Sequence, residues 1–340
     1  MLRKVKLDEA VGMVLGHDVT KVVPGKFKGP VFRRGHVILE EDLLELLSIG
    51  KEHIYVMELE KGEVHEEEAA LRIASAIGGA GIEFSQPREG RVNLKAKAHG
   101  LLKINVNLLK KINSLDEILI ATLHNNTVCH PGMILAGTKI VPLFTTDAKL
   151  GEVEKLCQLE GKVLEVKPIQ KKKVGVVITG NEIFKGIIQD KFGDVIRKKC
   201  EALGSVINHQ IIVPDDADTI AQAILGAKAK GSEVIVVCGG LSVDPDDVTV
   251  EGVRESGARV ISYGAPVMPG AMFLYALLDG IPVLGAPAAA SFNPVTILDL
   301  ILPRVLCGEK LSREDIIELG HGGLCLNCEK CSFPVCPFGK

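Results

Sequence analysis

Residues 239–249 form a glycine-rich and acidic stretch whose composition suits the binding of a phosphate group. The stretch directly follows an apolar run that we interpret as a buried strand. Gly239 and Gly240 let backbone N–H groups approach an anion closely, and the hydroxyl of Ser242 adds a donor. A carboxylate such as Asp247 cannot hold phosphate itself, but it suits Mg²⁺, which bridges acid and phosphate. The alternative is a turn that only caps the next helix.

Four of the nine cysteines lie within the last sixteen residues and form a second motif. They are Cys325, Cys328, Cys331 and Cys336, in the spacing C-x2-C-x2-C-x4-C, and Pro337 follows the last of them. Four thiolates can hold a [4Fe–4S] cluster or a structural Zn²⁺. The spacing is one residue longer than a bacterial ferredoxin run, and the trailing proline favours the cluster. Zinc and a metal-free tail are the alternatives, although zinc ribbons usually use two separated cysteine pairs.

From residue 172 onwards, apolar strand-like runs alternate with stretches of helical periodicity. We predict strands at 174–178, 205–213, 234–238, 259–263 and 281–284, and helices at 194–203, after Asp216, at 248–256 and at 294–306. Strands separated by helices are typical of an α/β, doubly wound and mainly parallel sheet. Such sheets bind ligands at the carboxyl ends of their strands, where the loops share one edge.

Three more loops fall on that predicted edge. Thr179 and Gly180 follow the first strand, and Glu182 places a carboxylate at the tip of the turn. Residues 269–272 and 285–290 supply two further loops that are rich in glycine, proline and alanine. Each loop by itself reads as an ordinary βα connection, but their common edge favours one shared pocket.

Composition bounds the remaining possibilities. A net charge of −3 leaves no broad basic surface for nucleic acid. The longest apolar stretch, Ala271–Leu278, is too short to span a membrane. Scattered cysteines in a chain with so large a core favour a reducing cytoplasm over a disulfide framework, and we expect a cytoplasmic protein.

The chain should divide into four segments. We expect a small mixed α/β segment at 1–60, a mixed α+β domain at 61–171, the α/β domain at 172–308 and a Cys-rich metal-binding tail at 309–340. Within the second segment, residues 66–77 place alanine and isoleucine on one face and predict a helix.

The order of motifs resembles the molybdopterin-binding domain shared by molybdopterin adenylyltransferases, molybdopterin molybdotransferases and the competence-damage-inducible protein A family. The matching phrases are Thr-Gly-Asn-Glu-Ile at 179–183, Val-Pro-Asp-Asp at 213–216, Gly-Gly-Leu-Ser at 239–242 with Asp247 and Thr249 behind it, and Pro-Gly at 269–270. The resemblance covers residues 172–308 and implies molybdopterin as ligand or substrate.

The resemblance also implies roles for individual residues. Gly239, Gly240 and Ser242 would cradle the phosphate of the pterin or the pyrophosphate of its adenylated form. The implied cofactor-binding set is completed by Thr179, Gly180, Thr249, Pro269 and Gly270, and the implied catalytic acids, which would hold Mg²⁺, are Glu182, Asp216 and Asp247 with Asp246 beside them. Ala271 and Met272 replace a Lys and a Pro of the family, which weakens stabilisation of developing negative charge.

Three functions fit these residues. The leading one is a molybdopterin-binding protein of molybdenum or tungsten cofactor biosynthesis or handling, which binds a phosphorylated pterin and forms a homo-oligomer. If it is an enzyme, we expect a molybdotransferase or adenylyltransferase-like transferase, with a molybdoenzyme as a client. The alternatives are a nucleotide pyrophosphatase like the competence-damage-inducible protein A family, and a non-enzymatic cofactor carrier or sensor.

Overall fold

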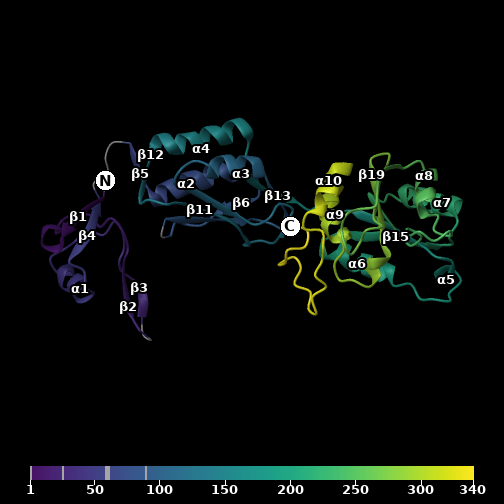
Figure 1. Cartoon of the computed structure of the whole chain (residues 1–340), viewed down its shortest axis with the longest axis horizontal. Coiled ribbons are helices and arrows are strands. Elements are labelled where there is room, and N and C mark those ends of the chain that lie inside the picture. Colours follow the sequence, from purple (N-terminus) through teal and green to yellow (C-terminus); the bar gives the residue numbers. More distant parts are fainter. Residues whose placement is uncertain (1, 25–26, 58–61, 89) are drawn as a thin grey trace. The chain divides into compact units, whose positions relative to one another are not determined.

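The computed structural model describes the chain except residues 1, 25–26, 58–61 and 89, and it divides into two compact units (Figure 1). Unit 1 comprises residues 1–97, 104–123 and 131–165, and unit 2 comprises residues 98–103, 124–130 and 166–340. Each unit buries hydrophobic clusters of its own. No helix in the described part of the chain is long and apolar enough to cross a bilayer.

Unit 1 begins with a small β-rich module. Its elements are β1 (Leu2–Lys6) paired antiparallel with β4 (His53–Met57), β2 (Val19–Val23) paired antiparallel with β3 (Phe27–Phe32), the short η1 (Leu7–Glu9) and α1 (Asp42–Ser48). Leu15, Ile38 and Leu46 form the centre of its core and are fully buried. The module therefore has a core large enough to hold its short strands together.

The rest of unit 1 is an antiparallel sheet covered by helices (Figure 1). The strand order in the sheet is β6 (Ile82–Phe84), β7 (Arg91–Ala96), β11 (Ile134–Ile140) and β9 (Ile118–Thr122). The helices are α2 (Glu66–Ile77), α3 (Val106–Asn113) and α4 (Asp147–Glu160). A separate pair of strands is formed by β5 (Glu63–His65) and β12 (Phe144–Thr146). Helix α2 has the predicted bounds, and its buried alanine and isoleucine face packs on β7 and β11.

Unit 2 is built on a six-stranded sheet. The strand order is β15 (Val206–Val213), β14 (Lys173–Thr179), β16 (Val234–Cys238), β19 (Ile281–Ala286), β18 (Leu274–Leu278) and β17 (Arg259–Tyr263). The first four strands are parallel, and β18 and β17 add an antiparallel edge. The predicted α/β, doubly wound and mainly parallel sheet is therefore confirmed.

Helices cover both faces of this sheet (Figure 1). They are α6 (Phe192–Ala202) and α9 (Ile297–Leu306) on one face, and α7 (Ala217–Ala229) and α8 (Thr249–Glu255) on the other. Successive side chains of a strand point to opposite faces of the sheet, so the domain has one hydrophobic core on each face. Val236 and Cys238 of β16 belong to the core under α9, whereas Val237 belongs to the core under α7 and α8. Each layer excludes water from one face of the sheet.

Two parts of unit 2 differ from the prediction. Strand β18 was read only as an apolar stretch, yet it forms a hairpin with β19 through Asp279 and Gly280, whose φ angles are +50° and +84°. Positive φ at both turn residues gives the backbone twist that two-residue hairpins need. Helix α9 begins at Ile297 rather than at 294, because Thr296 caps it in a reciprocal capping box with Asp299.

The remaining elements are short. They are β8 (Gly100–Ile104), β10 (Val128–Cys129) and β13 (Leu164–Pro168) in one small sheet, α5 (Asn181–Phe184), η2 (Ala288–Ser291), α10 (Arg313–Ile317) and η3 (Glu318–Gly320). Helix α10 is also closed by a capping box, between Ser312 and Asp315. It leads into the Cys-rich tail.

Candidate functional site: a pocket at the carboxyl ends of the parallel strands

The loops at the carboxyl edge of the unit 2 sheet enclose a pocket with a volume of about 230 Å³. Its lining comes from three loops: Gly239, Gly240, Leu241, Ser242 and Asp247 after β16; Gly270, Ala271 and Met272 before β18; and Pro287, Ala288 and Ala289 after β19. We call it the ligand pocket. Five residues of the predicted site meet in it: Gly239, Gly240, Ser242, Asp247 and Gly270.

Gly239 and Gly240 cannot be replaced by larger residues without moving the loop. Their φ angles are +97° and +57°, in the region that favours glycine. A Cβ atom on Gly239 would collide with the carbonyl oxygen of Thr179, and one on Gly240 would lie 2.5 Å from Oγ1 of Thr249. The pair therefore brings the backbone close to both the strand end and the pocket, as an anion-binding loop requires.

Two buried threonines hold this loop from behind. The Oγ1 atoms of Thr179 and Thr249 lie 3.2 Å apart, and Thr249 donates to the carbonyl of Gly239 at 2.9 Å. Thr179 is 2% exposed and Thr249 is fully buried. Both were predicted to bind the ligand, but neither lines the ligand pocket. They position the glycine loop instead.

Ser242, Asp247 and Tyr263 fix the far side of the loop. The carboxylate of Asp247 accepts the backbone N–H of Ser242 through Oδ2 at 2.8 Å. The hydroxyl of Tyr263 donates to the carbonyl of Leu241 at 2.9 Å. Burial, followed by the negative charge of Asp247, raises the pKa of Tyr263, so its hydroxyl remains a donor. The sequence analysis did not identify Tyr263, because no motif links a residue of β17 to the loop after β16.

In the described part of the chain, the backbone N–H groups of Gly240 and Leu241 donate to no other group of the protein. Leu241 is 4% exposed and anchors the loop in the core beneath it. Two adjacent donors on a rigid loop are the arrangement that binds an oxyanion.

Glu182, Asp216 and Gly180 of the predicted site also lie outside the lining of the ligand pocket, as Thr179 and Thr249 do. Glu182 is exposed on α5, and Asp216 is the N-cap of α7 and accepts the N–H of Thr219 at 2.8 Å. The hydrogen bonds from the Thr219 side chain and backbone hold the pKa of Asp216 below its usual value. Gly180 caps α5, whose first N–H, from Asn181, is bound by Asp215 at 2.8 Å. This contact ties the loops after β14 and β15 together.

The wall opposite the glycine loop carries no positive charge. Pro269 lies just outside it, and Gly270 packs so tightly that a Cβ atom would lie 2.7 Å from Cγ2 of Ile297. Ala271 and Met272 supply the next part of the wall, and none of the lining residues is lysine, arginine or histidine. The charge of a bound phosphate would therefore have to be balanced by backbone N–H groups and a metal ion.

Cys238, directly before the glycine loop, is not a nucleophile. Its thiol is fully buried, and burial raises its pKa, with further contributions from the negative charges of Asp190 and Cys200. A buried neutral thiol packs as a small hydrophobic side chain and does not react.

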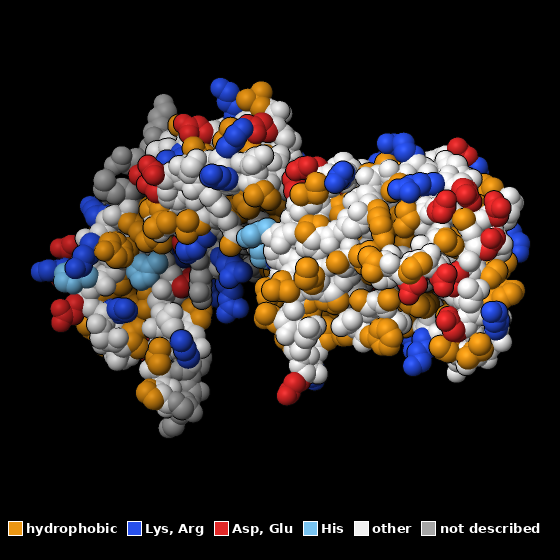
Figure 2. Space-filling model, turned by 45° about the vertical axis from the view of Figure 1, so that its right-hand side comes forward, with side chains coloured by type: hydrophobic (Ala, Val, Ile, Leu, Met, Phe, Trp, Pro, Cys, Tyr) orange, Lys and Arg blue, Asp and Glu red, His pale blue; other side chains and the backbone are white. Residues whose placement is uncertain are grey.

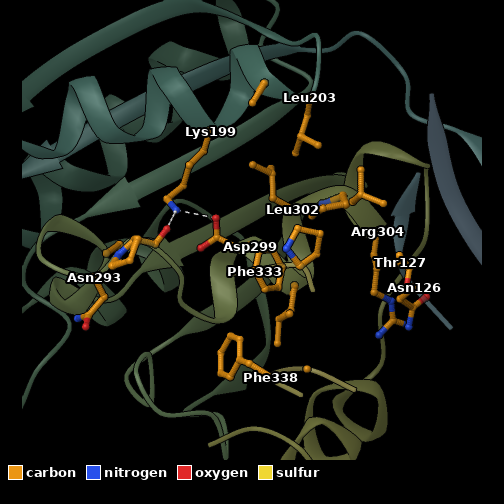
Figure 3. Close-up of a pocket in the computed structure, with 18 of the residues that line it drawn as sticks. Asn126, Thr127, Lys199, Leu203, Asn293, Asp299, Leu302, Arg304, Phe333 and Phe338 are labelled. Atoms are coloured by element: carbon orange, nitrogen blue, oxygen red, sulfur yellow. Dashed lines mark hydrogen bonds and ion pairs between the residues drawn. The ribbon is translucent and has the colours of Figure 1, made fainter. Parts of the chain in front are cut away.

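A larger cavity of about 750 Å³ lies elsewhere in unit 2, beside α6 and α9 (Figure 3). Two of its four lysine and arginine side chains form ion pairs: Lys199 binds Asp299 at 2.6 Å, and Arg304 binds Glu309 and Asp315. The other two are Lys198 and Lys340, and Lys340 donates to the hydroxyl of Thr127. Because the charges of Lys199 and Arg304 are neutralised within the protein, they attract an anionic ligand weakly. The smaller ligand pocket, at the sheet edge with free N–H donors, is the better candidate for phosphate.

The Cys-rich tail packs on the α9 face of unit 2. Cys325, Cys328, Cys331 and Cys336 all line a cavity of about 220 Å³ that also contacts the segment 293–295. All four thiols are free. Among the described residues, no three histidine, cysteine or acidic side chains are grouped closely enough for one metal ion.

Comparison with known proteins identifies the domain. Unit 2 is an α/β domain with a pocket and a glycine-rich loop at the carboxyl edge of its sheet. Residues 175–304 match the family described as a probable molybdopterin binding domain, and residues 4–58 match a domain of unknown function. Most of the six-stranded sheet of unit 2 therefore lies in a region that is similar to this probable molybdopterin binding domain.

Individual relatives agree over part of the chain. The molybdopterin adenylyltransferase of Pyrococcus furiosus is 30% identical over 92 residues, which cover 27% of this chain and 54% of that protein. A CinA-like protein of Citrifermentans bemidjiense is 36% identical over 91 residues, covering 26% of this chain and 21% of that protein. The molybdopterin biosynthesis MoeA protein of Pyrococcus horikosii is 13% identical with a TM-score of 0.33, and the match covers 91% of this chain and 75% of that one. This chain thus spans about half or less of its curated relatives' length.

Proposed function

We propose that the ligand pocket binds molybdopterin through its phosphate and that the protein acts in the biosynthesis or handling of the molybdenum or tungsten cofactor. The observation that carries the proposal is the glycine loop, which presents the free N–H groups of Gly240 and Leu241 at the carboxyl end of β16. The match of residues 175–304 to the molybdopterin-binding family supports it.

The phosphate would lie against the loop of residues 239–242. The two N–H donors and the hydroxyl of Ser242 would bind its oxygens, and the wall of residues 270–272 and 287–289 would contact the pterin. A pocket of about 230 Å³ is smaller than a whole drug-sized ligand needs, so part of the ligand would extend into solvent.

Mg²⁺ would supply the positive charge that the lining lacks. Asp247 uses Oδ2 to hold the N–H of Ser242, which leaves Oδ1 for a metal ion shared with the phosphate. Unit 2 also carries exposed acidic side chains, gathered on the right-hand side of Figure 2, which repel a free anion. Divalent metal would therefore be required for tight binding. Mg²⁺ suits this role, because proteins usually hold it through one or two carboxylates together with the phosphates of the substrate.

If the protein is catalytic, we propose an adenylyltransferase-like or molybdotransferase-like transfer in which Asp247 positions Mg²⁺ at the phosphate. Asp247 is the one predicted acid that lines the ligand pocket. Glu182 and Asp216 would then act on parts of the substrate outside it.

Two alternatives remain in the same pocket. The similarity to a CinA-like protein favours a metal-dependent nucleotide pyrophosphatase, which would use the acids 244, 246 and 247. The lack of a cationic side chain in the lining favours a carrier that binds without turnover, because no cation stabilises a leaving group.

We extend the proposal to the tail and to the protein's surroundings. The four cysteines would hold an iron–sulfur cluster or zinc, and nine free thiols suit a reducing cytoplasm. A homo-oligomer and a molybdoenzyme client are further expectations, which light scattering and pull-down with a purified molybdoenzyme would test.

Anaerobic purification followed by oxidation and identification of released pterin tests the function. Molybdopterin at near one equivalent supports it, and addition of ATP and Mg²⁺ then separates the activities. Pyrophosphate release with adenylated pterin indicates adenylyl transfer; hydrolysis of a dinucleotide indicates the pyrophosphatase; stable binding without turnover indicates a carrier. A protein that neither retains nor rebinds molybdopterin contradicts the proposal.

A further inference from the structure

The Cys-rich tail is a closed loop anchored at both ends. The N–H of Gly339 donates to the carbonyl of Gly322 at 2.9 Å, which joins the start of the loop to its end. Phe338 is 3% exposed and belongs to the core beneath α9. Its ring lies edge-on to the ring of Phe333, with 6.4 Å between the two ring centroids. All four cysteines lie between these anchors, so the loop is held around them before any metal binds.

The cavity inside the loop suits a cluster better than a single ion. Its volume of about 220 Å³ is several times the volume of about 30 Å³ that a water molecule occupies in the liquid. Each of the four cysteines lines it, and the rest of the wall is mainly apolar, from Pro294, Val295, Leu324, Leu326 and Phe333. Cysteine thiolates are the ligands that hold iron–sulfur clusters, and the cavity gathers four of them beside apolar side chains.

The spacing of the cysteines in the sequence supports the same conclusion. The run C-x2-C-x2-C-x4-C, followed by Pro337, is one residue longer than the bacterial ferredoxin run C-x2-C-x2-C-x3-C-P. Structural zinc sites more often combine two separated cysteine pairs.

The tail is joined directly to the wall of the ligand pocket. The N–H of Met268 donates to the carbonyl of Gly323, and the N–H of Cys325 donates to the carbonyl of Met268, both at 2.8 Å. Gly270, two residues further on, lines the ligand pocket. A second connection runs through the segment after β19: residues 287–289 line the ligand pocket, and residues 293–295 line the tail cavity.

We propose that Cys325, Cys328, Cys331 and Cys336 hold a [4Fe–4S] cluster, and that loading the cluster orders the Met268–Gly270 wall of the ligand pocket. The proposal rests on the proposed function only in naming that pocket as the one affected. Assembly of the oxidised cluster takes two ferrous ions, two ferric ions and four sulfide ions, and the four thiols lose their protons to the solvent as they bind iron. A loaded tail would hold the two hydrogen bonds of Met268 closed for more of the time than the metal-free loop does.

Anaerobic reconstitution of the full chain tests the cluster. Protein treated with equal amounts of ferrous and ferric iron and with sulfide should retain about four iron and four sulfide per chain and show visible absorption that bleaches on reduction. The variants Cys328→Ser and Cys331→Ser change exposed residues, so they should lose the bound iron and sulfide without unfolding. The variant Cys307→Ser, outside the tail, should retain both. Zinc bound at one equivalent through the same cysteines, with no sulfide retained, would overturn the proposal, as would no metal at all.

Hydrogen exchange tests the coupling without any pterin. In the loaded wild type, amide exchange over residues 265–272 should slow at least tenfold relative to the metal-free protein, and Cys328→Ser should show no change. Equal exchange in both states would overturn the coupling. Because neither readout uses molybdopterin, failure of pterin binding would count against the proposed function alone.

Discussion

The backbone N–H of Cys325 donates to the carbonyl of Met268 at 2.8 Å, and this hydrogen bond joins the cysteine tail to the ligand pocket. Met268 returns the contact through its own N–H, which Gly323 accepts. The two segments are far apart in sequence, yet they run parallel at a bridge between Met268 and Leu324. The tail therefore forms part of the support for the pocket rather than a separate appendage.

The close packing of the glycine loop leads us to expect that Gly240→Ala weakens both ligand binding and stability. The new Cβ would meet Thr249 Oγ1 at 2.5 Å and would sit at a φ of +57°, so the loop must move. We expect at least a tenfold loss of molybdopterin affinity and about 1–3 kcal/mol less stability. Gly231→Ala is the matched control, since its φ is also positive but open space surrounds it; it should bind normally. Equal effects of both variants would contradict the role of the loop.

The metal proposal predicts a specific effect of Asp247→Asn. The amide oxygen can still accept the N–H of Ser242, so the folding free energy should change by less than about 1 kcal/mol. The lost charge should remove the dependence of molybdopterin affinity on Mg²⁺, measured by calorimetry with and without a chelator. Asp244→Asn, on the exposed part of the same loop, should keep that dependence. A Mg²⁺ response in Asp247→Asn equal to that of the wild type would show that this carboxylate holds no metal.

Tyr263 offers a test of positioning from outside the pocket. Tyr263→Phe removes the hydrogen bond to the carbonyl of Leu241, and we expect a several-fold weaker affinity with about 1 kcal/mol less stability. Tyr275→Phe is the control, because it loses an acceptor for the N–H of Leu311 on the other side of the sheet. It should lower stability and leave affinity unchanged. Unchanged affinity in Tyr263→Phe would show that the loop holds its shape without the tyrosine.

His65 in unit 1 predicts a loss of stability in mild acid. Its ring is 2% exposed, and burial, with the nearby charge of Arg34, lowers its pKa to about 4. The neutral ring accepts the N–H of Glu67 and caps α2. Because the unfolded state takes up a proton near pH 6.5 and the folded state only near 4, the contribution of His65 to stability is complete above pH 6.5 and falls by roughly 3 kcal/mol as the pH drops to 4.

Urea unfolding of the full chain between pH 7.5 and 4.5, followed by circular dichroism, checks this expectation. His65→Asn keeps a capping oxygen but has no group that titrates in this range, so its stability should vary less with pH. A wild type and variant with the same pH dependence would show that His65 does not cause it.

The sequence predicted the unit 2 sheet well because its signals are local. Buried parallel strands such as β16 are continuous apolar runs, and Asp216 marks a helix start by its residue type. Strand β18 was not predicted, although Asp279-Gly280 is a strong hairpin signal. Both faces of β18 are buried, so its apolar residues do not alternate with polar ones and the strand lacks the usual pattern. The two threonines behind the loop were assigned to the ligand for a related reason, since a motif gives residue types but not the direction of a side chain.

The central claim is that the ligand pocket binds molybdopterin. The most direct test is an anaerobic titration of the full chain with molybdopterin and Mg²⁺, read out by hydrogen exchange along the chain. The account predicts saturable binding with slowed exchange in residues 239–249 and 270–272. No binding, or slowed exchange confined to the larger cavity around Lys199 and Leu203, would contradict it.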